Sequence, residues 1–352
     1  MKFYQDDSMA RKTRIQTMIR LLLKISLASA LIYWLISTGK LNFNELDILW
    51  RNPDILAFNL TFWVGGAAIL CSLRWRALVR GMGFTLSVFQ SVRLNLIGLF
   101  FNTVMPGMVG GDVVKALYVC KGQPGQARVP VLLTILLDRV LGLLALFCIS
   151  FVAILINFST IYENPLMRPF ILMTFSVICG ISTLVFMAAL SSETRDKVFF
   201  LRWLFAKIDQ IRILKKIYDA LRSYKDNPVF LVQAFGIAIV HQMLLVGLYF
   251  TVSRVLIDAQ LPLGILMTIL PIGVVTTAVP LTPGGLGVGH VAFDKLFQVA
   301  GLGPGGANIF NVVFFGQLFL NLLGFIPYLF LRNELAPLMD SEKAAAESQT
   351  TF

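Results

Sequence analysis

A series of apolar runs, several of them about 20 residues long, constrains this chain more than any other feature of its sequence. A helix of that length crosses the hydrocarbon core of a bilayer, and it satisfies its backbone hydrogen bonds internally. The runs predict six spans, at residues 21–37, 55–73, 129–158, 170–190, 229–252 and 308–331. We therefore expect an all-α polytopic membrane protein.

The composition agrees with a membrane location. Only 14% of the 352 residues are charged, against about a quarter in soluble proteins, and the mean hydropathy is +0.77. The net charge of +11 is typical of basic cytoplasmic loops, and no nucleic-acid-binding motif accompanies it. The chain has four scattered cysteines and two distant histidines, so we expect no metal site, no cofactor and no histidine-based catalytic centre.

One motif occurs twice with the same internal spacing. Thr103-x-x-Pro106-x-x-x-Gly110-Gly111 is repeated as Thr277-x-x-Pro280-x-x-x-Gly284-Gly285. Proline and paired glycines interrupt a helix, and in lipid such a break is tolerated only where protein or a wet cavity receives the freed backbone groups. Matched breaks in two halves of a chain indicate a transporter's binding site. The alternative is a pair of unrelated irregular loops.

Loop charges predict how these breaks lie in the membrane. If residues 84–105 crossed completely, the basic residues that follow would face outward, against the positive-inside bias. We therefore expect a re-entrant hairpin here and a second one around residues 263–299. A shift of 174 residues maps unit 55–158 onto unit 229–331, which predicts an inverted repeat. The total is six spans plus two broken-helix hairpins, or eight or more spans if the hairpins are counted.

The remaining segments complete the expected organisation. Residues 1–20 form a basic cytoplasmic N-terminus, residues 21–331 a single transmembrane domain, and residues 332–352 a disordered cytoplasmic tail. Residues 193–227 form an amphipathic linker, either on the cytoplasmic leaflet or as an ordinary solvated helix. The expected location is a bacterial-type inner membrane with both termini in the cytoplasm.

The first unit contains a set of ionisable residues, namely Arg93, Asp112, Lys115, Asp138 and Arg139. A charge at membrane depth costs about 3 kcal/mol or more, so it faces protein or water and finds a partner. Asp138 and Arg139 point about 100° apart on one helix. We expect Asp138 to pair with Arg93 or Lys115, leaving Arg139 to bind a ligand anion. The alternative is a set of internal ion pairs that lock the hairpin to its neighbour.

Glycines at the two breaks suggest anion binding. Gly110 and Gly111 allow a backbone turn to present its N–H groups, and Asp112 is expected to cap the helix that runs to Cys120. Glycines of the second break allow the same from the other side. A nucleotide P-loop is rejected because no Gly-Lys-Ser/Thr follows. His290 begins the next helix, and His241 with Gln242 forms an expected hydrogen-bonding pair within a span.

At these residues the chain resembles a known family. FNTVMPGMVGGDVVK, LLDRVLGL and PLTPGGLGVGHVAF resemble blocks of the lysylphosphatidylglycerol synthase transmembrane-region family, a flippase-like family that includes the membrane half of the multiple peptide resistance factor. The resemblance implies these motif positions: Asn102, Pro106, Gly110, Gly111, Asp112, Asp138, Arg139, Pro283, Gly284, Gly285 and Gly287. Lys115 stands where the family commonly has Arg, and His290 where it commonly has Glu. His290 thus removes a fixed negative charge, which favours an anionic headgroup.

We therefore expect a flippase-like protein that binds and translocates a lipid with an anionic headgroup, either a phospholipid or a polyprenyl-phosphate-linked glycan. The alternatives are a membrane-embedded lipid-modifying transferase and a non-catalytic partner of a lipid or envelope-glycan enzyme. The expected partners are membrane lipid and, in the last case, that enzyme; a homo-oligomer is compatible with both. The candidate substrate-binding residues are Arg93, Asn102, Pro106, Gly110, Gly111, Asp112, Lys115, Asp138, Arg139, Pro280, Pro283, Gly284, Gly285, Gly287 and His290.

Overall fold

The structure is a computed structural model that describes residues 49–104, 110–120, 128–189, 210–256, 261–277 and 288–331. All regular elements within these ranges are helical. The chain divides into two compact units, Met1–Arg51 and Asn52–Phe352, and the second contains every described residue except 49–51. The expected span at 21–37, the N-terminal segment, the first part of the linker and the tail lie outside the described residues.

The structure contains α-helices, one π-helix and one 3-10 helix within the described residues. Their bounds are α3 Pro53–Leu60, η1 Thr61–Ala67, α4 Ala68–Gly81, α5 Val88–Val104, α6 Gly110–Val119, α7 Arg128–Ile156, α8 Phe158–Glu163, η3 Pro165–Met167, α9 Arg168–Ala189, α12 Arg212–Arg222, α13 Pro228–Leu256, α14 Leu263–Thr277, α15 Val288–Val299 and α16 Gly306–Leu323.

Within the described residues, five helical segments are long and apolar enough to cross a membrane. They are Pro53–Gly81, Val129–Ile156, Pro165–Ala188, Pro228–Leu256 and Gly306–Leu331. These coincide with five of the six spans expected from the sequence. The first is longer than predicted, because the helix continues past Leu73 to Gly81 and carries Arg74 inside the protein. The predicted end of this span at residue 73 was therefore too early. Burial with an opposite charge can hold an arginine inside a helix bundle.

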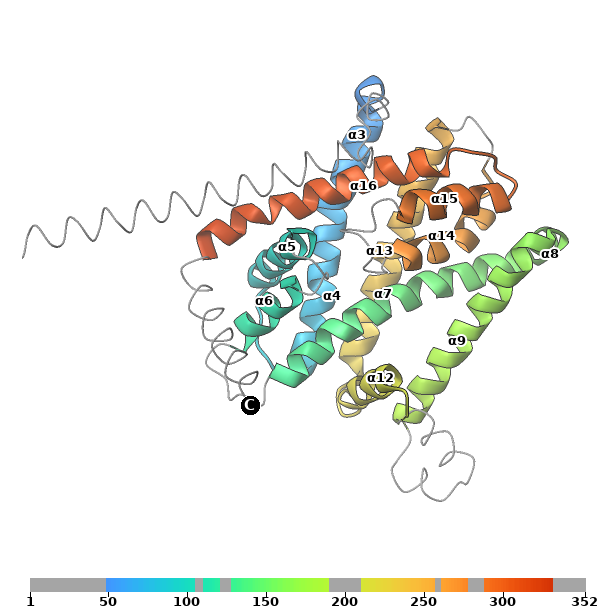
Figure 1. Cartoon of the computed structure of the whole chain (residues 1–352). Coiled ribbons are helices and arrows are strands. Elements are labelled where there is room, and N and C mark those ends of the chain that lie inside the picture. Colours follow the sequence, from blue (N-terminus) through green and yellow to red (C-terminus); the bar gives the residue numbers. More distant parts are fainter. Residues whose placement is uncertain are drawn as a thin grey trace, which may run out of the picture. The chain divides into compact units, whose positions relative to one another are not determined.

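Two groups of four elements share the same order of long, short, short and long helices. The first runs from the continuous span of α3, η1 and α4 through α5 and α6 to α7, and the second from α13 through α14 and α15 to α16. The two opening helices, α4 and α13, pack on each other, while α5 packs on α16 and α14 packs on α7. Each short pair therefore contacts the closing helix of the other group. In Figure 1 the α5–α6 pair lies to the left of α4 and the α14–α15 pair to the right of α13.

Side-chain hydrogen bonds join the first span to α16. The span includes a π-helical stretch, η1, which begins one residue after Leu60. Asn59 Nδ2 donates to the carbonyl of Val312 at 2.6 Å, and Trp63 Nε1 donates to that of Val313 at 3.0 Å. Both donor residues are buried. A buried N–H group that lacked an acceptor would cost its desolvation free energy, so these two hydrogen bonds favour the observed packing. The two hydrogen bonds therefore determine which face of the first span packs against α16.

The described part of the linker packs against protein. Helix α12 contacts α7 and α9, and its Tyr218 and Leu221 are buried in a cluster that includes Leu137 and Met187. The apolar side of the amphipathic helix is thus largely covered by neighbouring helices. Its expected contact with the cytoplasmic leaflet stays a prediction. Helix α9, in contrast, exposes apolar residues such as Leu172 and Phe186, as expected of a helix that faces lipid.

Candidate functional site

A cavity of about 360 Å³ lies among the helices of both groups. Its wall is formed from the first span, α5, α6, α7, α13, α14 and α16. Its polar and charged lining residues are Arg74, Asn95, Asn102, Thr103, Asp112, Lys115, Asp138, Arg139, His241, Gln242, Thr277, Gln317 and Asn321. The cavity therefore gathers five of the sequence-predicted site residues, namely Asn102, Asp112, Lys115, Asp138 and Arg139.

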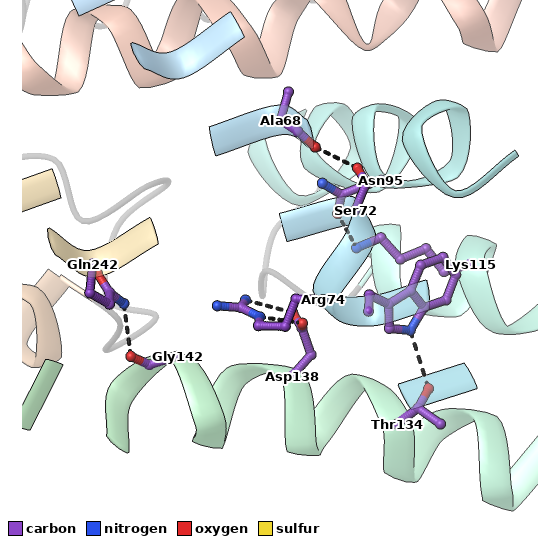
Figure 2. Close-up of polar contacts among 10 residues, drawn as sticks. Ala68, Ser72, Arg74, Asn95, Lys115, Thr134, Asp138, Gly142 and Gln242 are labelled. Atoms are coloured by element: carbon purple, nitrogen blue, oxygen red, sulfur yellow. Dashed lines mark hydrogen bonds and ion pairs between the residues drawn. The ribbon is translucent and has the colours of Figure 1, made fainter. Parts of the chain in front are cut away.

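Arg74 and Asp138 form a forked ion pair between α4 and α7. Arg74 Nε donates to Asp138 Oδ1 at 2.6 Å, and Nη2 donates to Oδ2 at 2.9 Å (Figure 2). The side chains are only 8% and 17% exposed. The prediction that Asp138 pairs with Arg93 or Lys115 was wrong. Arg74 meets it because the first span continues as helix alongside α7, and a guanidinium fork matches a carboxylate better than an ammonium does.

Arg139 of α7 pairs with Asp112 of α6. Its Nη2 lies 2.5 Å from Asp112 Oδ2, joining α7 to α6, and its side chain is 48% exposed while that of Asp112 is 12% exposed. The prediction that Arg139 is left for a ligand anion is corrected, because an adjacent carboxylate already neutralises it. Here the alternative interpretation, in which ion pairs lock the hairpin to its neighbour, describes the geometry.

Lys115 is the buried cation of α6. Its Nζ donates to Asn95 Oδ1 of α5 at 2.8 Å and lies 5.2 Å from the ring centroid of Trp75. The residue is 7% exposed, and within the described part of the chain it forms no ion pair with a carboxylate. The lysine stem passes against Gly98, where a Cβ would overlap Lys115 Cε. Glycine at position 98 thus makes room for the lysine to reach the cavity.

The start of α6 is held by Asn102 rather than capped by Asp112. Helix α6 begins at Gly110, so Asp112 lies within its first turn, and the prediction of Asp112 as N-cap was wrong. Asn102 Oδ1 instead accepts from the N–H of Gly111 at 2.9 Å. A Cβ on Gly111 would overlap the backbone of Gly98, so the glycine allows α5 and α6 to approach closely. The N–H of Gly111 is therefore already bonded to protein.

Several lining residues were not among the predicted site residues. Gln242 Nε2 donates to the carbonyl of Gly142 at 2.8 Å, so the expected pair with His241 was wrong. Asn321 Nδ2 donates to Thr103 Oγ1 at 2.9 Å, across the two groups of helices. A signal for these residues existed, since polar side chains within apolar spans usually face protein or a wet cavity. The sequence did not indicate which of them converge.

The other predicted site residues lie elsewhere or outside the described ranges. Arg93 and His290 do not line the cavity. Arg93 lies over the ring of Phe89, and His290 contacts Asn311 and the edge of Phe310. Gly110 is described only as the first residue of α6. The predicted positions outside the described residues are Pro106, Pro280, Pro283, Gly284, Gly285 and Gly287.

The cavity's charges and donors suit an anion better than a metal ion. Its described lining has three cationic side chains and two carboxylates, which leaves one positive charge in excess. The oxygens of Asp112 and Asp138 contact arginines, and the described residues contain no cluster of three His, Cys, Asp or Glu side chains that could hold a metal ion. The arrangement can bind an anion by charge and hydrogen bonds. A metal-dependent transferase would first have to separate these ion pairs.

Comparison with known proteins identifies the family. The family described as "Lysylphosphatidylglycerol synthase TM region" matches residues 21–324 of the chain. The chain belongs to this family. Its relatives include a UPF0104 membrane protein of Methanocaldococcus jannaschii, 23% identical over 308 residues, which cover 81% of this chain and 87% of the relative. A UPF0104 membrane protein of Pyrococcus horikoshii is 23% identical over 164 residues, 46% of each chain.

Membership of the lysylphosphatidylglycerol synthase TM region family, together with the five apolar helices, makes the chain an integral membrane protein of a lipid-related family. The sequence resemblance to that family is thereby confirmed. No solved structure matches the chain. The family match covers every charged residue that lines the cavity, from Arg74 to Arg139.

Proposed function

We propose that this protein binds an amphiphilic lipid by its anionic headgroup in the central cavity and moves the lipid between the two leaflets. The observation that carries the proposal is the position of Lys115, a buried basic side chain at the cavity. The arginines of the cavity contact carboxylates, whereas among the described residues the ammonium contacts a neutral amide and an aromatic ring and forms no ion pair with a carboxylate. A buried charge is costly until an opposite charge reaches it. A phosphate group would supply that charge.

The size and position of the cavity support this function. A volume of about 360 Å³ is within the range of small-molecule pockets, and it suits a headgroup better than a whole lipid. The lining residues come from both helix pairs as well as from the spans, for example Asn95 from the first pair and Thr277 from the second. The acyl tails would stay in the bilayer while the headgroup occupies the cavity.

The mechanism that we propose is a rocking of two inverted repeat units about the headgroup. The recurring helix order and the reciprocal packing of α5 on α16 and α14 on α7 support it. In this mechanism the two short pairs are re-entrant hairpins that enter from opposite faces. The termini would lie in the cytoplasm and the membrane would be a bacterial-type inner membrane. The family's printed name, which refers to a phosphatidylglycerol derivative, agrees with a phospholipid substrate.

Reconstitution in liposomes tests the proposal. Wild-type protein should accelerate the movement of a tail-labelled phosphatidylglycerol between leaflets, and Lys115→Met should slow it about tenfold or more, because a charged hydrogen bond is lost. Lys115→Arg should retain most of the activity. Lys295→Met, a change to an exposed lysine of α15, is the matched control and should behave as wild type. Folded Lys115→Met protein with wild-type activity would contradict the role of the ammonium.

A further inference from the structure

The cavity also contains polar side-chain atoms that have no hydrogen-bond partner among the residues that the structure describes. Within the described residues these are Asn95 Nδ2, Gln242 Oε1, Asn321 Oδ1 and both ring nitrogens of His241. All four residues line the cavity, and Asn95, His241 and Gln242 are only 4%, 8% and 6% exposed. Buried polar atoms without a partner are rare in native proteins because each costs about 1–3 kcal/mol. So many in one cavity indicate a ligand that bonds to them.

Neighbouring bonds fix which atom of each amide is left over. Lys115 can only donate, so Asn95 turns its oxygen to the ammonium and leaves its NH₂ group. The Gly142 carbonyl can only accept, so Gln242 turns its NH₂ group to it and leaves Oε1. Thr103 already donates its hydroxyl proton to the carbonyl of Leu99, so it accepts from Asn321 Nδ2, which leaves Oδ1. The unpartnered atoms are thus an amide donor next to Lys115 and two carbonyl-type acceptors.

Asn95 and Gln242 lie on different sides of the Arg74–Asp138 ion pair. In Figure 2 the Arg74–Asp138 pair lies between Gln242 on one side and Asn95 with Lys115 on the other. Lys115 Nζ and Asn95 Nδ2 suit the oxygens of a phosphate, which only accept when ionised. Gln242 Oε1 and Asn321 Oδ1 would repel those oxygens and need a proton donor instead. A neutral His241 provides one donor and one acceptor, and a hydroxyl group satisfies both kinds of atom.

We propose that the cavity selects a phosphodiester whose headgroup carries free hydroxyls, such as a glycerol or a sugar, with Gln242, His241 and Asn321 binding the hydroxyls. The inference deepens the proposed function and rests on it. An ammonium headgroup would satisfy the acceptors too, but it would meet the excess positive charge of the lining. The substrate class is therefore an anionic lipid with a polyhydroxylated headgroup.

Three tail-labelled lipids of equal charge test the selection, by their affinity for the purified full-length protein in detergent micelles. The affinity for phosphatidylglycerol and for phosphatidylinositol should be at least about tenfold higher than the affinity for phosphatidylmethanol, which has the phosphodiester but no hydroxyl. His241→Phe should reduce this preference at least threefold without loss of folding, since the described contacts of the ring are the weakly hydrogen-bonding thiol of Cys71 and the ring of Phe62, whose centroid lies 5.9 Å away. Gln242→Met should reduce it as well, and Gln233→Met, an exposed position on the same helix, should not.

Each other outcome overturns a stated part of the inference. Equal affinity for all three lipids, or an unchanged preference in both cavity variants, would refute the hydroxyl site while leaving anion binding intact. Phosphatidylethanolamine, whose headgroup carries an ammonium group, serves as a fourth lipid. If it bound most tightly of all, the hydroxyl site would be refuted too. Failure of every anionic lipid to bind would refute the proposed function itself. If soluble glycerophosphoglycerol bound as tightly as the lipid, the hydroxyl site would stand, but its ligand would be a water-soluble phosphodiester.

Discussion

Arg74 and Asp138 are 64 residues apart in the sequence, yet their side chains form two hydrogen bonds of 2.6 and 2.9 Å inside the bundle. The pair joins the first long helix of one helix group to the last. It also occupies the carboxylate of Asp138, and Lys115 forms no ion pair with a carboxylate among the described residues. The ion pair therefore has a structural effect and an electrostatic effect at the cavity.

Arg74→Met should destabilise the protein strongly. Removal of one partner leaves Asp138 buried without compensation, which costs about 3–5 kcal/mol in comparable cases. The double variant Arg74→Met/Asp138→Leu should regain most of this loss, because neither charge then remains. Thermal unfolding in detergent measures the effect. Arg254→Met, at an exposed position of α13, is the matched control and should change the melting temperature little. A double variant no more stable than Arg74→Met would contradict this account.

Gly111→Ala should disrupt the first helix pair. A methyl group at this position overlaps the backbone of Gly98, which cannot move aside without separating α5 from α6. We expect a loss of at least about 2 kcal/mol, within the range for overpacked sites. Gly180→Ala in α9 is the control, since nothing lies within 4 Å of its added Cβ, and it should be neutral or slightly stabilising. Equal melting temperatures for the two variants would exclude the close approach.

Asn102→Ala should weaken the start of α6. The variant loses the acceptor for the N–H of Gly111, and substitution of such a capping residue typically costs about 1 kcal/mol. Asn102→Asp keeps an acceptor near the positive end of the helix dipole and should restore the stability. Amide hydrogen exchange in α6 measures this directly. Faster exchange in Asn102→Ala than in Asn102→Asp is expected, and identical rates would contradict the capping role.

Tyr224 should make stability depend on alkaline pH. Its hydroxyl donates to the carbonyl of Leu78 at 2.7 Å, and burial raises the pKa of Tyr224 above the ordinary value of about 10. The stabilisation by the neutral Tyr224 hydroxyl is therefore fully present below the tyrosine pKa of the unfolded state. It is lost as the pH rises from that value to the higher pKa of the folded state. Tyr224→Phe should cost about 1 kcal/mol at neutral pH and remove this part of the alkaline loss. Chemical unfolding at pH 8 and pH 11 tests the difference.

The sequence predicted the described spans well because length and apolarity decide them locally. The run beginning at Val229 and the one beginning at Asn308 needed no knowledge of their neighbours. It also predicted a charged set of Arg93, Asp112, Lys115, Asp138 and Arg139, and all of these except Arg93 line the cavity, since charges in an apolar region converge on each other or on water. The sequence did not predict which charged residues pair with each other. Whether Asp138 meets Arg74 or Lys115 depends on the rotation and depth of two packed helices.

For residues of the second half, too, the sequence did not predict which side chains meet at the cavity. His241, Gln242 and Asn321 line the cavity with their unpartnered atoms, although only the first two stood out in the sequence, and as an expected pair with each other. Helical periodicity gives the face on which a side chain lies, but not the helix that covers this face. By itself, then, the sequence determined a helical membrane protein and most of the charged residues that line its cavity. The tertiary structure alone decided which charges neutralise each other and which polar atoms stay unpaired, because both depend on contacts between helices far apart in the chain.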